Sequence, residues 1–145
     1  MPNNPASVMQ EWFDRLWNAG DETTIARLLD PHGEVHGLPT PDGQPIRGPE
    51  GFAPFYRAFR DAFPDIHIEV LHSVSEGEWT VAHCRVTGAH TGQGLGLVAT
   101  GTSVTFHGFA LGRIVDGKLV EAWNCFDFLS MYQQLGVPMQ LPAPA

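Results

Sequence analysis

The segment from Ser103 to Phe126 reads SVTFHGFALGRIVDGKLVEAWNCF and indicates the class of fold. Alternate residues on each side of its centre are apolar, which is the period of a strand with one buried face. Asp116-Gly117 is a strong signal for a tight hairpin turn. The segment therefore predicts two antiparallel strands, at residues 103–115 and 119–126.

Two more strands are predicted directly before this hairpin. Residues 66–70 alternate Ile, Val and polar side chains, and residues 79–87 do the same after the turn Glu76-Gly77-Glu78. Consecutive strands joined by short turns favour an antiparallel sheet over alternating strands and helices. Residues 88–101 contain five glycines, and we expect this segment to form a mobile lip over a pocket.

Three main helices are predicted around these strands. Residues 7–20 and 49–63 carry aromatic stripes at helical spacing, and Asp127 can cap a last helix that ends at Gly136. A short helix follows Asp21, and residues 36–48 are predicted to be a loop rich in Pro and Gly. The expected fold is α+β, a cone-shaped curved antiparallel sheet packed on three helices. We expect a single domain over residues 7–137, with tails at 1–6 and 138–145.

Composition excludes several classes of function. The chain has 145 residues, 16 acidic against 8 basic, and a formal net charge of −8. This charge repels nucleic acid and anionic membranes. The start of the chain has no signal-peptide pattern, and Cys84 and Cys125 are expected to be reduced thiols in a cytoplasmic protein. No histidine or cysteine spacing matches a metal motif, so neither a metal nor a cofactor is expected.

The order of several motifs resembles the SnoaL-like polyketide cyclases, in the nuclear transport factor two superfamily. The motifs are Phe13-Asp14-Arg15-Leu16-Trp17-Asn18-Ala19-Gly20-Asp21, Val35-His36-Gly37, Gly48-Pro49-Glu50-Gly51, Ala62-Phe63-Pro64-Asp65, Thr87-Gly88-Ala89-His90-Thr91-Gly92, the hairpin at 116–127 and Gln134-Leu135-Gly136. The resemblance implies a cone-shaped fold, a homodimer and cofactor-independent ring closure of a polyketide by an intramolecular aldol reaction.

Three residues are predicted to carry the chemistry. His36 matches a family position and titrates near neutrality, so it is a candidate base, although a loop histidine bonded to backbone is the alternative. His90 could hydrogen-bond a substrate carbonyl at the pocket mouth or simply occupy a turn. Asn124 stands where the family typically has a catalytic Asp, and its amide can donate a hydrogen bond to an oxyanion but cannot accept a proton, although a buried amide satisfied by a neighbouring strand is the alternative.

The expected ligand is a hydrophobic small molecule. Residues predicted to contact it are Phe13, Trp17, Phe55, Phe59, His107 and Phe126. Two functions remain open at this point. One is a cyclase or related acid–base isomerase acting on a hydrophobic carbonyl compound. The other is a binding protein of the same fold without catalytic activity, which the amide at position 124 favours.

Overall fold

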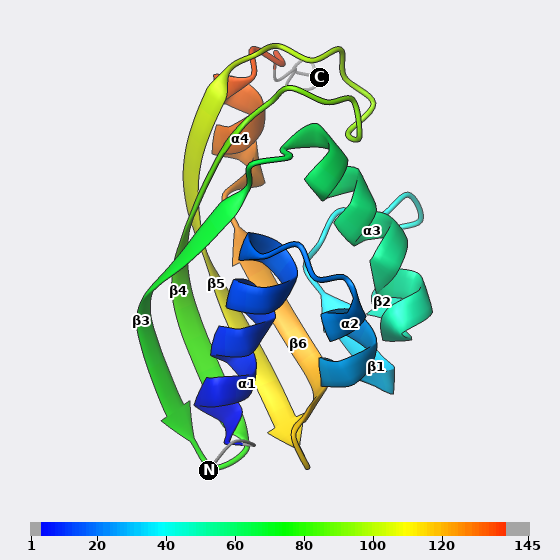
Figure 1. Cartoon of the computed structure of the whole chain (residues 1–145), viewed down its shortest axis with the longest axis vertical. Helices are drawn as coiled ribbons and strands as arrows, with labels where there is room; N and C mark the ends of the chain where they lie inside the picture. Colours follow the sequence, from blue (N-terminus) through cyan, green and yellow to red (C-terminus); the bar gives the residue numbers. More distant parts are fainter. Residues whose placement is uncertain (1–3, 139–145) are drawn as a thin grey trace, which may run out of the picture.

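Six strands form one curved sheet in the computed structural model, which describes residues 4–138 (Figure 1). The strand order is β2-β1-β6-β5-β4-β3. The strands are β1 (Leu29–His36), β2 (Ile46–Arg47), β3 (His67–Glu76), β4 (Trp79–Ala89), β5 (Ser103–Val115) and β6 (Lys118–Phe126). The mixed α+β class and the curved sheet confirm the predicted fold.

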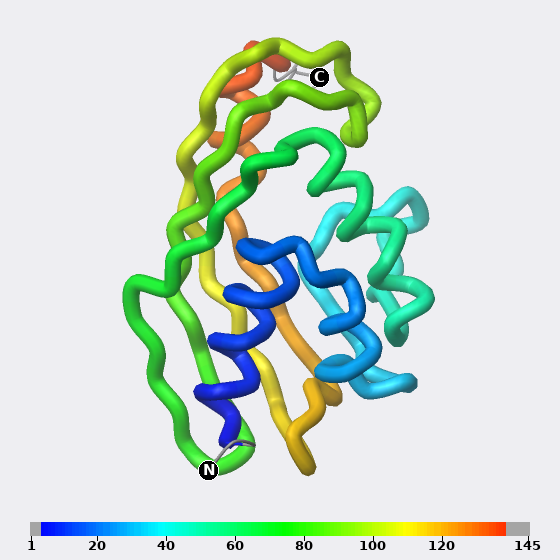
Figure 2. Tube along the Cα trace, viewed as in Figure 1, coloured from blue at the N-terminus to red at the C-terminus, as the bar shows by residue number. Residues whose placement is uncertain are grey.

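The helices lie on one side of the curved sheet, and the trace in Figure 2 shows the sheet bending around them. They are α1 (Pro5–Glu11), the π-helical segment η1 (Trp12–Asn18), α2 (Thr23–Leu28), α3 (Gly48–Ala62) and α4 (Phe128–Gln134). The first helix begins inside the predicted tail, because the side chain of Asn4 rather than Ser7 caps it by accepting the Ser7 N–H at 2.8 Å. The remaining predicted tail positions 1–3 and 139–145 lie outside the described residues.

Two strands, β1 and β2, were not predicted from the sequence. Residues 29–36 form β1, which runs parallel to β6, so the sheet is not purely antiparallel. Pro31 and Gly33 disturb the alternation that would have marked a strand, and the register with β6 shifts between Leu29 and Glu34. The predicted loop 36–48 is shortened at its far end by β2, which pairs with β1.

The two faces of the sheet differ sharply in burial. On β5, Val104, Phe106 and Ala110 are buried under the helices, whereas His107 and Phe109 point to the outer face and are exposed. The same alternation continues on β6 from Glu121 to Phe126, whereas a register shift beside Arg113 and Ile114 also buries Leu119. The period of two therefore predicted correctly which residues of the hairpin face the helices, except near its turn.

The glycine-rich segment between β4 and β5 packs against α3. A Cβ atom at Gly92 would lie 1.7 Å from the Asp61 carbonyl oxygen, and one at Gly94 would lie 1.9 Å from that of Ala58. These glycines allow the segment to contact the helix backbone directly. None of its residues lines the pocket described below, so the expectation of a lip over that pocket is wrong. Within residues 4–138, no helix combines the length and the apolar character needed to cross a membrane.

Candidate functional site

An apolar pocket lies between the helices and the inner face of the sheet. It has about 670 Å³ of empty space including its open mouth. Its walls come from η1, α3, β6 and neighbouring strands. The aromatic residues that line it are Trp12, Phe13, Trp17, Phe52, Phe55, Phe59, Phe106, Phe126 and Phe128. Such a surface suits a flat hydrophobic molecule.

Asn124 is the one side chain with a hydrogen-bond acceptor among the described residues that line this pocket, and the indole N–H groups of Trp12 and Trp17 are donors only. It lies on the inner face of β6 with Ala122 and Phe126, because alternate residues of a strand share a face. Its Nδ2 donates a hydrogen bond to the backbone carbonyl oxygen of His36 at 3.1 Å. The amide is therefore tied to the end of β1.

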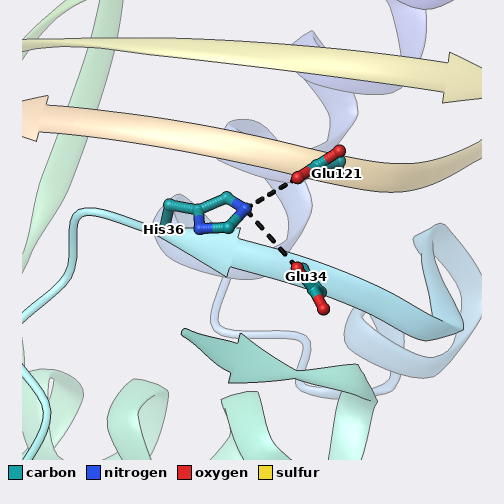
Figure 3. Close-up of side chains that lie close together, drawn as sticks. All are labelled: Glu34, His36 and Glu121. Carbon is teal, nitrogen blue, oxygen red and sulfur yellow. Dashed lines mark hydrogen bonds and ion pairs between the residues drawn. The ribbon is translucent and has the colours of Figure 1, made fainter. Parts of the chain in front are cut away.

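The side chain of His36 lies on the outer face of the sheet, away from the pocket. Figure 3 shows its imidazole between two carboxylates, with Nε2 2.8 Å from Glu121 Oε2 and 3.7 Å from Glu34 Oε2. The ring also stacks on Trp123, with centroids 5.3 Å apart. The pairing of β1 with β6 brings these residues together. The structure therefore does not place the imidazole of His36, the predicted base, among the residues that line the pocket.

His90 is fully buried, and its contacts fix the glycine-rich segment. Nδ1 accepts the backbone N–H of Thr100 at 3.2 Å, and the ring packs against Phe63. Nδ1 must be unprotonated to accept this bond, so a neutral ring carries its proton on Nε2, which has no partner within the described chain. His90 does not line the pocket. Its position supports the alternative of a structural residue in this turn.

Five of the six predicted ligand contacts line the pocket, namely Phe13, Trp17, Phe55, Phe59 and Phe126. The sixth, His107, lies on the outer face of β5, so the expectation that it contacts a ligand in this pocket is corrected.

The sequence analysis did not name Trp12, Phe52, Phe106 or Phe128 as ligand contacts. The sequence nevertheless contains a pattern that could have identified three of them. Trp12 and Phe52 belong to the same helical stripes as the residues that were named, and Phe106 follows the alternation of its strand.

Ionisable side chains are absent from the part of the pocket lining that the structure describes. The shifted pKa values belong to residues elsewhere. Burial raises the pKa of the Cys84 thiol to about 12 and also raises the pKa of Tyr56. The Thr23 hydroxyl lowers the pKa of Asp21, and Arg57 lowers that of Glu22. No lining residue is thus available as a general acid or base.

One trio of possible metal ligands occurs within residues 4–138, and it is Glu34, His36 and Glu121. Their ligand atoms lie within 4.8 Å of one another, on the outer face rather than in the pocket. Arg47 also forms an ion pair with Glu34. Arg47 and the His36 ring face the carboxylates of this cluster, which holds the ring on the face opposite the pocket.

The structural class is an α+β fold in which a curved sheet and the helices on one of its faces surround an apolar pocket. The family model of SnoaL-like polyketide cyclases matches residues 7–135. Aklanonic acid methyl ester cyclase DnrD of Streptomyces peucetius is 36% identical over 98 residues, which cover 67% of this chain and 68% of that protein. The chain therefore belongs to the SnoaL-like polyketide cyclase family, which confirms the resemblance found in its motifs.

Two further comparisons agree with this assignment. Nogalonic acid methyl ester cyclase of Streptomyces nogalater is 29% identical over 119 residues, covering 81% of this chain and 84% of that protein. The crystal structure of wild-type IdmH from Streptomyces antibioticus has a TM-score of 0.78 at 28% identity, covering 92% of this chain and 99% of that one.

Proposed function

We propose that this protein binds a hydrophobic carbonyl compound of the polyketide class and promotes its ring closure by an intramolecular aldol reaction, without a cofactor. The observation that carries the proposal is an aromatic pocket whose described lining has a single amide side chain, Asn124. The names of two relatives, which are methyl ester cyclases, support the reaction class.

The aldol reaction makes limited chemical demands on the pocket. A proton leaves the carbon beside one carbonyl, that carbon bonds to a second carbonyl carbon, and the second oxygen gains a proton. Aromatic walls that fold the chain bring the two carbons together and reduce the entropy cost of ring closure. The remaining N–H of Asn124 can hydrogen-bond to the oxygen that gains negative charge. Water at the open mouth takes up and returns the protons.

We infer that Asn124 replaces the catalytic carboxylate that the family resemblance implies at this position. An amide cannot exchange a proton, so ring closure here depends on positioning and on the hydrogen bond. We therefore expect a slower catalyst than a relative with a carboxylate in the pocket. General acid–base groups contribute roughly 10²–10⁴-fold to such reactions.

The second candidate function is binding without turnover. The absence of ionisable side chains from the described pocket lining favours it. A protein of this kind would carry or sequester the same hydrophobic compound.

One assay separates the two functions. Native protein and Ala122→Phe, which fills the pocket, are incubated with aklanonic acid methyl ester, and substrate and cyclised product are followed by chromatography. Turnover above the protein-free rate that is lost in Ala122→Phe supports the cyclase. Saturable binding without turnover supports the carrier. If native protein neither binds nor converts the compound, this substrate class is wrong.

We also propose that two copies associate through the outer face of the sheet. Val74, Trp79 and Phe109 are 67%, 42% and 52% exposed on neighbouring strands of that face. Apolar side chains of this size lose unfavourable contact with water when a second copy covers them. The helices already cover the inner face, so the outer face is the side available for pairing.

A further inference from the structure

The orientation of the Asn124 amide is fixed by its neighbour. Its contact at 3.1 Å is the backbone carbonyl oxygen of His36, which can only accept a hydrogen bond. The NH₂ side of the amide must therefore face β1, because the reverse orientation would bring two acceptor oxygens together. Oδ1 is then the amide atom that does not take part in the bond to β1.

The carbonyl oxygen of His36 is itself held firmly in place. A Cβ atom at Gly37 would lie only 1.9 Å from the Asn124 carbonyl oxygen, so the end of β1 sits tightly against β6. On the opposite face, Glu121 contacts the imidazole of His36 (Figure 3), and Trp123 stacks on the same ring. These contacts on both faces position the acceptor that orients Asn124.

The amide has hydrogen-bonding capacity left for a ligand. After the bond to His36, Asn124 keeps one N–H donor and the acceptor Oδ1. Oδ1 has no partner within residues 4–138 and is not among the buried, unpaired atoms of that part of the chain, so it remains accessible, and the only bond of Nδ2 there is the one to His36. A ligand that covers them with apolar surface leaves both unpaired, which is unfavourable.

We propose that Asn124 determines specificity by pairing with a ligand carbonyl that has a hydrogen-bond donor directly beside it, such as a hydroxy-carbonyl, an enolised dicarbonyl or a carboxamide. The ligand carbonyl accepts the free N–H of Asn124, and the neighbouring donor binds Oδ1. Apart from the indole N–H donors of Trp12 and Trp17, the other described side chains of the lining are apolar, so none of them can replace Oδ1 as the acceptor for the ligand's donor. This inference rests on the proposed function in assigning an aromatic small molecule to the pocket.

Isosteric probes test the pairing. Equilibrium dialysis measures the affinity of 2-naphthamide and of 2-acetonaphthone, which differ in that an NH₂ donor is replaced by CH₃. We expect 2-naphthamide to bind roughly tenfold more tightly, as one additional hydrogen bond in an apolar site allows. Asn124→Leu keeps the branched shape of the side chain without its polar atoms and should abolish the preference while still binding the ketone. Gln93→Leu removes an exposed amide outside the pocket and should keep the preference.

The possible results separate a failure of the Asn124 pairing from a failure of the proposed function. Equal affinity of the two probes for native protein overturns the pairing but leaves an aromatic ligand in place. A preference that persists in Asn124→Leu overturns the role of Asn124. If neither probe binds, the pairing fails together with the assignment of an aromatic ligand to the pocket. Circular dichroism of each variant shows whether it is folded.

Discussion

The imidazole of His36 and the amide of Asn124 lie on opposite faces of the sheet, yet the two residues are directly hydrogen-bonded. The backbone carbonyl of His36 accepts the Nδ2–H of Asn124 at 3.1 Å, while its side chain contacts Glu121 on the other face. A substitution in the cluster of Glu34, His36 and Glu121 can therefore affect the Asn124 amide in the pocket through the backbone of β1. It cannot do so by proton transfer from the imidazole to a ligand in the pocket.

Asn124→Asp should introduce proton-transfer activity. Burial among apolar groups and a hydrogen bond from the protonated carboxyl to the His36 carbonyl both raise the pKa of the new group. Its activity as a base should therefore rise with pH, since the deprotonated form accepts the proton. We expect a gain of roughly 10²–10⁴-fold in the cyclase assay. No gain at any pH between 5 and 9 would show that position 124 does not contact the reacting atoms.

His36→Ala in the Asn124→Asp background should retain most of that gain, because the imidazole faces away from the pocket. This is the opposite of the result expected for a histidine that acts as the base. Comparing the single and double variants in the same assay tests the placement directly. Loss of the whole gain, with the fold intact by circular dichroism, would assign His36 a direct role in catalysis.

Gly37→Ala should destabilise the protein by about 2–5 kcal/mol, from steric overlap and the left-handed backbone conformation. Gly37 has a φ of +84°, and an added Cβ would lie 1.9 Å from the Asn124 carbonyl oxygen. Gly43→Ala is the matched control, because Gly43 has a φ of +70° with nothing within 4 Å of the added atom. Urea unfolding of both variants measures the difference. Similar losses would mean that the contact between β1 and β6 is not tight.

Phe109→Glu should weaken self-association, because it places a charge at the centre of the exposed aromatic surface of the sheet. Sedimentation velocity at micromolar concentration should show a dimer for native protein and a monomer for this variant. Val98→Glu, at a position 81% exposed in the glycine-rich segment, serves as the control and should remain a dimer. A native protein that sediments as a monomer would disprove association through this face.

Cys84 should resist alkylation in the folded protein, because the thiolate is the reactive form and burial raises the pKa of this thiol to about 12. Peptide mapping after iodoacetamide treatment at pH 8.5 should show Cys84 modified only in urea. The unfolded chain releases this proton at lower pH than the folded protein, so this residue's contribution to stability decreases as pH rises from about 9 toward 12. Rapid labelling of native Cys84 would contradict its burial.

Local patterns predicted the β5–β6 hairpin and its faces well. Asp116-Gly117 forms the turn, and the alternation around Phe106 and Ala110 matches their burial. Asp127 caps α4 as expected, with its side chain accepting the Ser130 N–H at 3.0 Å. These features depend on neighbours close in sequence, so period and turn chemistry are enough to predict them.

The sequence by itself determined the helices, the antiparallel hairpins and the aromatic composition of the pocket, because spacing along one element fixes which side chains share a face. Only the tertiary structure decided that residues 29–36 pair in parallel with β6 and that His36 faces outward. That pairing joins residues 88 positions apart, as in the bond between Asn124 and His36. No local period encodes the partner of such a strand, since long-range packing selects it among competing pairings.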